Sequence, residues 1–155
     1  MEKYESIMLK NQLCFPLYLC SKEIIRKYTP LLDEFDLTYT QYIVMMYMWE
    51  VKESNVKELG KTILLDSSTL TPLLKKLEVK GYIKRERNAL DERNIIITLT
   101  NTGENLKDKV IDIPKKVGKC INLNEKEAKY LYNILYKILK NVVEEENESN
   151  WRKKW

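Results

Sequence analysis

Cys14 is the residue of this 155-residue chain whose type and position point most directly to chemistry. It precedes Phe15 and Pro16, and proline is tolerated in the first turn of a helix, where backbone N–H groups have no helical acceptor. We therefore expect a helix to begin near Cys14. The positive end of a helix dipole favours thiolate over thiol, and thiolate is the form that a peroxide oxidises to a sulfenic acid.

Plainer interpretations of the cysteines are also possible, and the sequence around them does not exclude these. A free cysteine is commonly a small buried hydrophobe, and Cys14 fits that description as well. Cys20 continues an apolar stripe and is expected in the core; the other members of the stripe are Leu13, Leu17 and Ile24. Because the cysteines lack metal-ligand spacing and the chain has no histidine, we expect neither a zinc site nor any other cofactor.

A second group of candidate residues lies between positions 66 and 80. Asp66 and Ser67 are an N-cap signal for a helix that runs to Lys80, where Gly81 supplies the stop. Its apolar stripe consists of Leu70, Leu73, Leu74 and Leu77. The opposite face carries Ser68, Thr69, Thr71, Pro72, Lys75 and Lys76. Hydroxyls and ammonium groups suit phosphates and base edges in a major groove.

Two β-like runs, 82–87 and 94–99, follow this helix and are joined by a polar loop. Between Lys75 and Arg93 there are seven basic and four acidic residues, so the net charge of +4 is concentrated here. Asp91 and Arg93 are two apart and share one side of an extended strand, where the carboxylate can hold the guanidinium ready for a minor groove. A solvated charged face with an incidental ion pair is the plainer alternative.

The rest of the chain is read as helices that position these groups. A helix from Leu9 to about Tyr28 is expected to break at Thr29-Pro30, with a short segment at 31–35. Further helices are expected at 38–50, at 55–64, from Asn101 towards Lys119, and from a capping box at Asn124 to about Val143, before a frayed polar tail, 144–155. Two short helices followed by a hairpin give a mainly α fold with a small β wing, a winged helix-turn-helix.

Length and composition favour one domain, 1–155, with a buried core. No apolar run reaches the roughly 18 residues that span a membrane, and no signal pattern is present. Reduced thiols then indicate a cytoplasmic protein.

The segment 66–100 resembles the DNA-binding lobe of the MarR family of bacterial regulators, in DSSTLTPLLKKLEVKGYIKRER and DERNIIITLT. NQLCFPLYLCSKEI and LTYTQYIVMMYMWE are similar to the OhrR branch, repressors that sense organic hydroperoxides. The likeness extends from about residue 10 to 143. It implies a homodimer with interlocked helices at about 8–30 and 101–143, a winged-helix lobe at about 31–100, and a pseudo-palindromic operator in double-stranded DNA.

The resemblance also implies roles for single residues. Cys14 would react with peroxide, Tyr18 and Tyr28 of the partner subunit would donate hydrogen bonds to its thiolate, and Tyr39 would lie close by. Arg93 would enter the minor groove, held by Asp91. Candidate DNA contacts elsewhere are Ser67, Ser68, Thr69, Thr71, Lys75, Lys76 and Arg85. Some relatives have a second, resolving cysteine near the start of the C-terminal region. Cys120 therefore either captures the oxidised Cys14 in an inter-subunit disulfide or packs a helix end.

Helix geometry supports a dimer independently. At about 1.5 Å per residue, Tyr28 lies roughly 21 Å along a continuous helix from Cys14, so the two can meet only between subunits.

The expected function is a repressor that releases its operator when an organic hydroperoxide oxidises Cys14. One alternative is a MarR-type repressor that responds to a phenolic or drug-like ligand or to another electrophile. A more remote alternative is a thiol peroxidase. It would need the strand–helix alternation of a thioredoxin-like fold and would leave the basic lobe unexplained, so we expect no enzyme.

Overall fold

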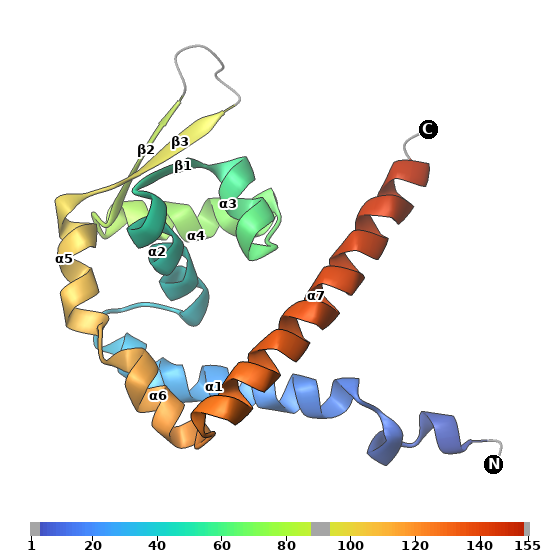
Figure 1. The fold of residues 1–155 in the computed structure, drawn as a ribbon. Coiled ribbons are helices and arrows are strands. Elements are labelled where there is room, and N and C mark those ends of the chain that lie inside the picture. Colours follow the sequence, from blue (N-terminus) through green and yellow to red (C-terminus); the bar gives the residue numbers. More distant parts are fainter. Residues whose placement is uncertain (1–3, 88–93, 154–155) are drawn as a thin grey trace. The chain divides into compact units, whose positions relative to one another are not determined.

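The computed structural model describes residues 4–87 and 94–153, with side chains up to residue 143 (Figure 1). The predicted hairpin tip, with Asp91 and Arg93, lies outside the described residues. The chain divides into two compact units, Met1–Val117 and Gly118–Trp155.

The first unit begins with two single-turn helices, η1 (Glu5–Ile7) and η2 (Leu9–Asn11), and the long helix α1 (Cys14–Asp33). Helix α1 starts at Cys14 with Pro16 in its first turn, as predicted. The predicted break at Thr29-Pro30 is wrong, because α1 continues through Pro30 to Asp33. Pro30 is exposed, so water can donate a hydrogen bond to the carbonyl in the preceding turn that loses its helical donor. The Thr29 hydroxyl also donates to the Ile25 carbonyl at 3.3 Å.

Helices α2 (Tyr39–Val51), α3 (Val56–Ile63) and α4 (Ser67–Val79) form the helical part of the lobe. Each begins at a side-chain cap, supplied by Thr38, Asn55 and Asp66 respectively. The leucine stripe of α4 is buried as predicted, and Gly81 ends this region with φ of 73°. The core around it includes Leu32, Met45, Met48, Leu59 and Ile97.

A three-stranded antiparallel sheet completes the lobe. Strands β2 (Ile83–Arg87) and β3 (Ile95–Leu99) confirm the predicted hairpin arms, with Arg85 opposite Ile97. Strand β1 (Glu53–Asn55) pairs with the other side of β3, so the order is β1-β3-β2. Strand β1 was not predicted, because its three residues are all polar and show no alternation of polar and apolar side chains.

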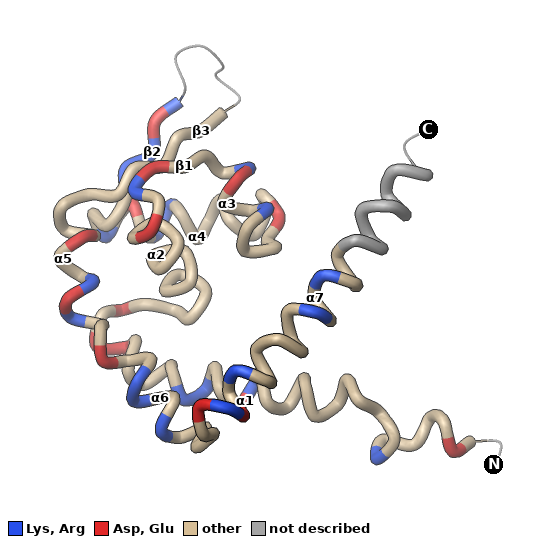
Figure 2. Tube along the Cα trace, viewed as in Figure 1, with Lys and Arg blue, Asp and Glu red and all other residues tan. Residues whose placement is uncertain are grey.

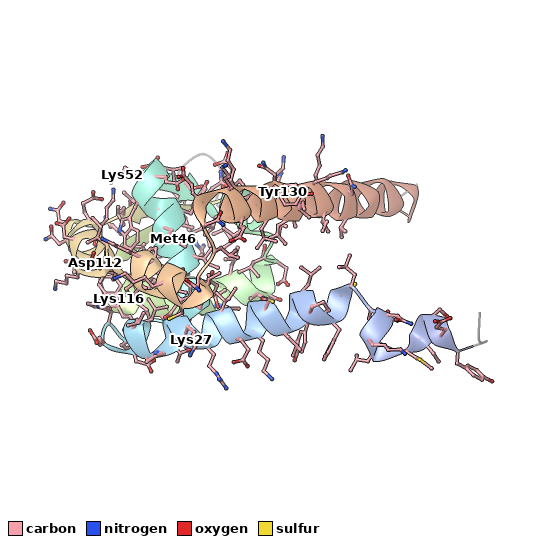
Figure 3. The ribbon with its side chains drawn as sticks, turned by 60° about the horizontal axis from the view of Figure 1, so that its bottom comes forward. Lys27, Met46, Lys52, Asp112, Lys116 and Tyr130 are labelled. Carbon is pink, nitrogen blue, oxygen red and sulfur yellow. The ribbon has the colours of Figure 1, made fainter. Side chains whose placement is uncertain are left out.

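Helices α5 (Asn101–Val110) and α6 (Ile113–Ile121) follow the sheet. One continuous helix was predicted here, and the chain instead turns at residues 111–112. Pro114 accounts for the interruption, because it suits the first turn of a new helix and lacks the N–H that a continuing one needs. Helix α5 is fixed to α2 by a bond from Trp49 Nε1 to the Gly103 carbonyl, 2.8 Å. Lys52, the residue that follows α2 and is labelled in Figure 3, forms an ion pair with Glu104 of α5 at 2.5 Å.

The second unit is dominated by α7 (Glu125–Lys153). Its predicted capping box is present: the Asn124 side chain accepts from the Glu127 N–H at 3.0 Å, and the Asn124 N–H donates to the Glu127 carboxylate at 2.9 Å. The predicted end near Val143 is wrong, since the helix continues to Lys153. The extra turns contain good helix formers such as Glu, Arg and Lys and neither Gly nor Pro.

Across the described ranges, no helix is long and apolar enough to cross a membrane. The same residues contain no cluster of His, Cys, Asp and Glu that could hold a metal ion.

Candidate functional site

The exposed side of α4 carries the hydroxyls and amines that the sequence places there. All the predicted candidates on this helix are exposed: Ser67, Ser68, Thr69, Thr71, Lys75 and Lys76. The Asp66 carboxylate accepts from the Ser68 hydroxyl at 2.5 Å and from the Thr69 N–H at 2.8 Å. These bonds, that of Ser68 foremost, lower the pKa of Asp66, so the cap is charged at neutral pH. The Thr69 hydroxyl also donates to Asp66, at 3.2 Å, so the Ser68 and Thr69 hydroxyls are both oriented by this carboxylate and keep lone pairs as acceptors.

A cleft of about 690 Å³ opens beside the start of α4. Ser67 and Thr71 line it from α4, Arg85 lines it from β2, and Asn94 lines it from just before β3. Helix α3 contributes Lys57 and Lys61, which the sequence reasoning missed. Their spacing of four residues on one side of a short amphipathic helix was an available signal. The hydroxyl face of α4 is therefore bordered by further cations.

Arg85 is engaged within the chain. Its Nη2 and Nε lie 2.6 and 2.9 Å from Glu78 Oε2, and its backbone N–H donates to Glu78 Oε1 at 3.1 Å. Only 17% of the Arg85 side chain is exposed. The Arg85 bond holds the pKa of Glu78 below its usual range.

The predicted excess of positive charge is smaller than the residue count implies. Lys80 pairs with Asp36 at 2.7 Å and Lys84 with Glu86 at 2.5 Å, in addition to the Arg85–Glu78 pair. Along β2 one acidic residue, Glu86, stands among three basic ones, while β3 is uncharged (Figure 2). Of the basic residues from Lys75 to Arg87, three form no ion pair with another described residue: Lys75 and Lys76 on the exposed face of α4, and Arg87 at the end of β2.

Cys14 is the first residue of α1 and is exposed. The preceding residue, Leu13, provides no side-chain cap, so the N–H groups at this end of the helix are left without that acceptor. Tyr18 lies one turn further on and is 61% exposed. Cys20 is exposed as well, and its predicted place in the core is wrong. The stripe has helical spacing, but the only fully buried residue of α1 is Leu32, near its other end.

Tyr28 and Tyr39 are brought together by the packing of α1 against α2. Their ring centroids are 4.8 Å apart, and the ring centroid of Tyr42 lies 6.0 Å from that of Tyr28. Burial raises the pKa of Tyr28 and Tyr39, and it raises that of Tyr42 to about 12. All three phenols therefore stay protonated and can donate hydrogen bonds. Sequence reasoning missed Tyr42, which it assigned only to a buried apolar helix.

The structure does not bring Cys14 and Tyr28 together within one chain, since both lie on the unbroken helix α1. Cys120 is exposed on α6 and belongs to the second unit. Its pairing with Cys14 stays a prediction.

The three-helix lobe, the hydroxyl-bearing and basic α4, and the attached hairpin define a winged-helix DNA-binding regulator. A family model described as "Transcriptional regulator SarA/Rot" matches residues 26–110. The chain belongs to this family of MarR-like winged-helix transcriptional regulators, and its resemblance to the OhrR branch is confirmed.

Two curated relatives span nearly the whole chain. The organic hydroperoxide resistance transcriptional regulator of Bacillus subtilis is 41% identical over 140 residues, 90% of this chain and 95% of the relative. The HTH-type transcriptional regulator SarZ of Staphylococcus aureus is 50% identical over 131 residues, 84% of this chain and 88% of the relative.

Solved structures agree. Reduced AbfR bound to DNA is 38% identical, with a TM-score of 0.75 over 91% of this chain and 99% of that one. AbfR of Staphylococcus epidermidis is 37% identical, with a TM-score of 0.74 over 93% and 99%. MarR, at 19% identity and a TM-score of 0.76 over 88% and 95%, shows the likeness of the fold alone.

Proposed function

We propose that this regulator is a repressor that releases its operator when an organic hydroperoxide oxidises Cys14. The observation that carries the proposal is an exposed thiol at the first residue of α1, on a chain whose relative in Bacillus subtilis is an organic hydroperoxide resistance regulator. Solved forms of the similar AbfR are described as reduced, overoxidised and disulfide-formed. Redox chemistry is therefore known for a protein of this fold at 37–38% identity.

The working unit is a homodimer. Exposed apolar side chains lie just before α1, at Leu13, along it, at Leu19 and Ile25, and along α7, at Leu131, Leu135, Leu139 and Val142. Burying such surface yields about 25 cal/mol per Å², so these segments of about 8–30 and 101–143 favour association with a second copy. In the dimer, Tyr18 and Tyr28 of one subunit donate hydrogen bonds to the Cys14 thiolate of the other, with Tyr39 packed beside Tyr28.

Oxidation proceeds in two steps. The Cys14 thiolate attacks one peroxide oxygen, the O–O bond breaks, and the departing alkoxide takes a proton to become an alcohol. The resulting sulfenic acid no longer accepts the tyrosine hydrogen bonds as thiolate did. A second thiol, Cys120 of the other subunit or a small cellular thiol, then attacks the sulfenic sulfur, forming a disulfide and releasing water. Repacking at the dimer interface changes the spacing of the two DNA-binding lobes.

On the operator, α4 lies in the major groove and the hairpin tip in the flanking minor groove. The contacts from α4 are those of Ser67, Ser68, Thr69, Thr71, Lys75 and Lys76. Arg93, held by Asp91, enters the minor groove. Two-fold symmetry requires a pseudo-palindromic site with half-sites about 34 Å apart or a multiple of that. Since its ligand is chromosomal DNA, the protein acts in the cytoplasm.

A gel-shift titration on the region upstream of its own gene tests the proposal. Reduced protein should retard the duplex, and one equivalent of cumene hydroperoxide should free it. Cys14→Ser should bind equally well and ignore the oxidant. If both proteins bind and neither responds, the signal is a ligand or another electrophile, and Cys14 has no sensing role.

A further inference from the structure

Glu78 and Arg85 connect the recognition helix to the hairpin. Glu78 lies in the last turn of α4, and Arg85 is the middle residue of β2. One carboxylate receives three hydrogen bonds, two from the guanidinium and one from the backbone of the strand, at 2.6–3.1 Å. Charge-assisted bonds of this kind are roughly twice as strong as neutral ones, and the planar guanidinium fixes their direction.

This pair differs from the other ion pair of the hairpin in its burial. Exposure is 17% for the Arg85 side chain and 35% for Glu78, against 65% and 59% for Lys84 and Glu86. Exposed pairs contribute little because water screens them. The Glu78–Arg85 pair is shielded and joins two elements, whereas Lys84–Glu86 joins two residues of one strand.

The end of α4 is also held on its other side. Lys80 contacts both the carboxylate and the main-chain carbonyl of Asp36, in the connection between α1 and α2. The helix is therefore fixed to the body of the lobe, and the Glu78–Arg85 bonds decide where β2 lies against it. Both partners are partly buried, and Arg85 lines the cleft beside Ser67 and Thr71, so the pair lies at the edge of the exposed face of α4 that carries the hydroxyls and lysines.

We propose that Glu78 and Arg85 form a clamp that sets the position of the hairpin relative to α4, and that both are positioning residues for DNA binding. A protein that inserts a helix in the major groove and a hairpin in the next minor groove must match the spacing of the grooves. The clamp supplies that spacing before DNA is bound. Arg85, a candidate DNA contact by sequence, acts through Glu78 instead.

The direction in which one substitution changes the affinity for DNA distinguishes the clamp from a direct contact between Arg85 and DNA. Glu78→Gln removes a negative charge close to the DNA-binding face. By charge alone, this change strengthens binding to a phosphate backbone. If the carboxylate positions the hairpin, the same change weakens binding, by about tenfold for the loss of a shielded charge-assisted bond. Glu86→Gln is the matched control, because it also removes one negative charge, from the residue after Arg85 in β2, without touching the clamp.

The experiment measures affinity for a 30-base-pair duplex, selected by the wild-type protein from a random-sequence pool, using reduced protein. We expect Glu78→Gln and Arg85→Gln to weaken binding about equally, and the double variant to be no weaker than the poorer single one. Glu86→Gln should bind as tightly as wild type or more tightly. Tighter binding by Glu78→Gln, with Arg85→Gln alone losing affinity and about one unit of salt slope, would make Arg85 a direct contact and overturn the clamp.

Hydroxyl-radical footprints distinguish positioning from general damage to the fold. With the clamp broken, protection should be lost in the minor grooves that flank the site and persist in the central segment, with near-ultraviolet circular dichroism unchanged. Uniform loss of protection would contradict the proposal. The inference depends on DNA binding and not on Cys14, so a protein that ignores hydroperoxide still tests it.

Discussion

Cys14 and Tyr28 lie on one unbroken helix, so the hydrogen bond proposed between them can form only across two subunits. Tyr28 is half-buried against Tyr39 and Tyr42, which fixes its ring where α1 meets α2. In the proposed dimer, helix α1 supplies Cys14 to one site and Tyr28 to the symmetry-related site. Under this proposal, oxidation of one Cys14 acts on the packed tyrosines of the opposite subunit.

Tyr28→Phe tests this arrangement. Removing the hydroxyl should slow sulfenic-acid formation at Cys14 by roughly three- to tenfold, because a thiolate that loses one donor is less populated. Trapping with dimedone and mass spectrometry gives the rate. Tyr130→Phe, on a tyrosine that is 71% exposed, is the control and should react like wild type. Equal rates for Tyr28→Phe and wild type would remove Tyr28 from the site.

Cys120→Ser tests the resolving role. Oxidised wild-type protein should run as a covalent dimer on a non-reducing gel, whereas Cys120→Ser should run as a monomer and accumulate sulfinic acid. Cys20→Ser, at the other exposed thiol of α1, should still form the dimer. A covalent dimer that persists in Cys120→Ser would rule out the Cys14–Cys120 disulfide.

Gly103→Ala should destabilise the lobe by about 2–4 kcal/mol, because an added Cβ would collide with the Tyr82 carbonyl and the Leu99 side chain. The change would also disturb the carbonyl that accepts from Trp49. Urea unfolding measures the loss. Gly118→Ala is the matched control: its Cβ meets nothing within 4 Å, so it should be neutral or stabilising by up to about 1 kcal/mol. Similar curves for both variants would refute the packing argument.

Tyr42 should make stability depend on alkaline pH. Burial raises its pKa from 10.0 to about 12 in the folded chain, so the unfolded state loses its proton first as pH rises. The stability associated with the neutral phenol is complete below pH 10 and is lost between about pH 10 and 12. In urea titrations at pH 8 and 11, the free energy of unfolding should fall less between the two pH values for Tyr42→Phe than for the wild-type protein. An equal fall in both proteins would argue against a protonated, buried Tyr42.

Local signals in the sequence predict much of the fold. The caps at Asp66 and Asn124 and the stop at Gly81 depend only on neighbouring residues, and all three are found where expected. The errors arise where a local signal competes with its surroundings. Pro30 is accommodated because it faces solvent, and Cys20 is exposed because a regular apolar stripe does not say which element covers it.

The site was predictable to a lesser extent. The exposed face of α4 follows from helical spacing alone, and it is confirmed. The contact between Tyr28 and Tyr39 needs the packing of α1 on α2, and the Glu78–Arg85 clamp needs a strand folded back onto the helix before it. Neither of these two contacts can be predicted from the spacing of the residues along the sequence.

The proposed function requires that oxidation of Cys14 releases the DNA. The most direct measurement follows the anisotropy of a labelled operator duplex while cumene hydroperoxide is added to reduced protein in steps below one equivalent. Intact-mass spectrometry on the same samples gives the oxidised fraction of Cys14. We expect the released DNA to increase in step with that fraction, dithiothreitol to restore binding, and Cys14→Ser to hold the duplex throughout. DNA that stays bound to fully oxidised protein, or release from Cys14→Ser at the same doses, would contradict the account.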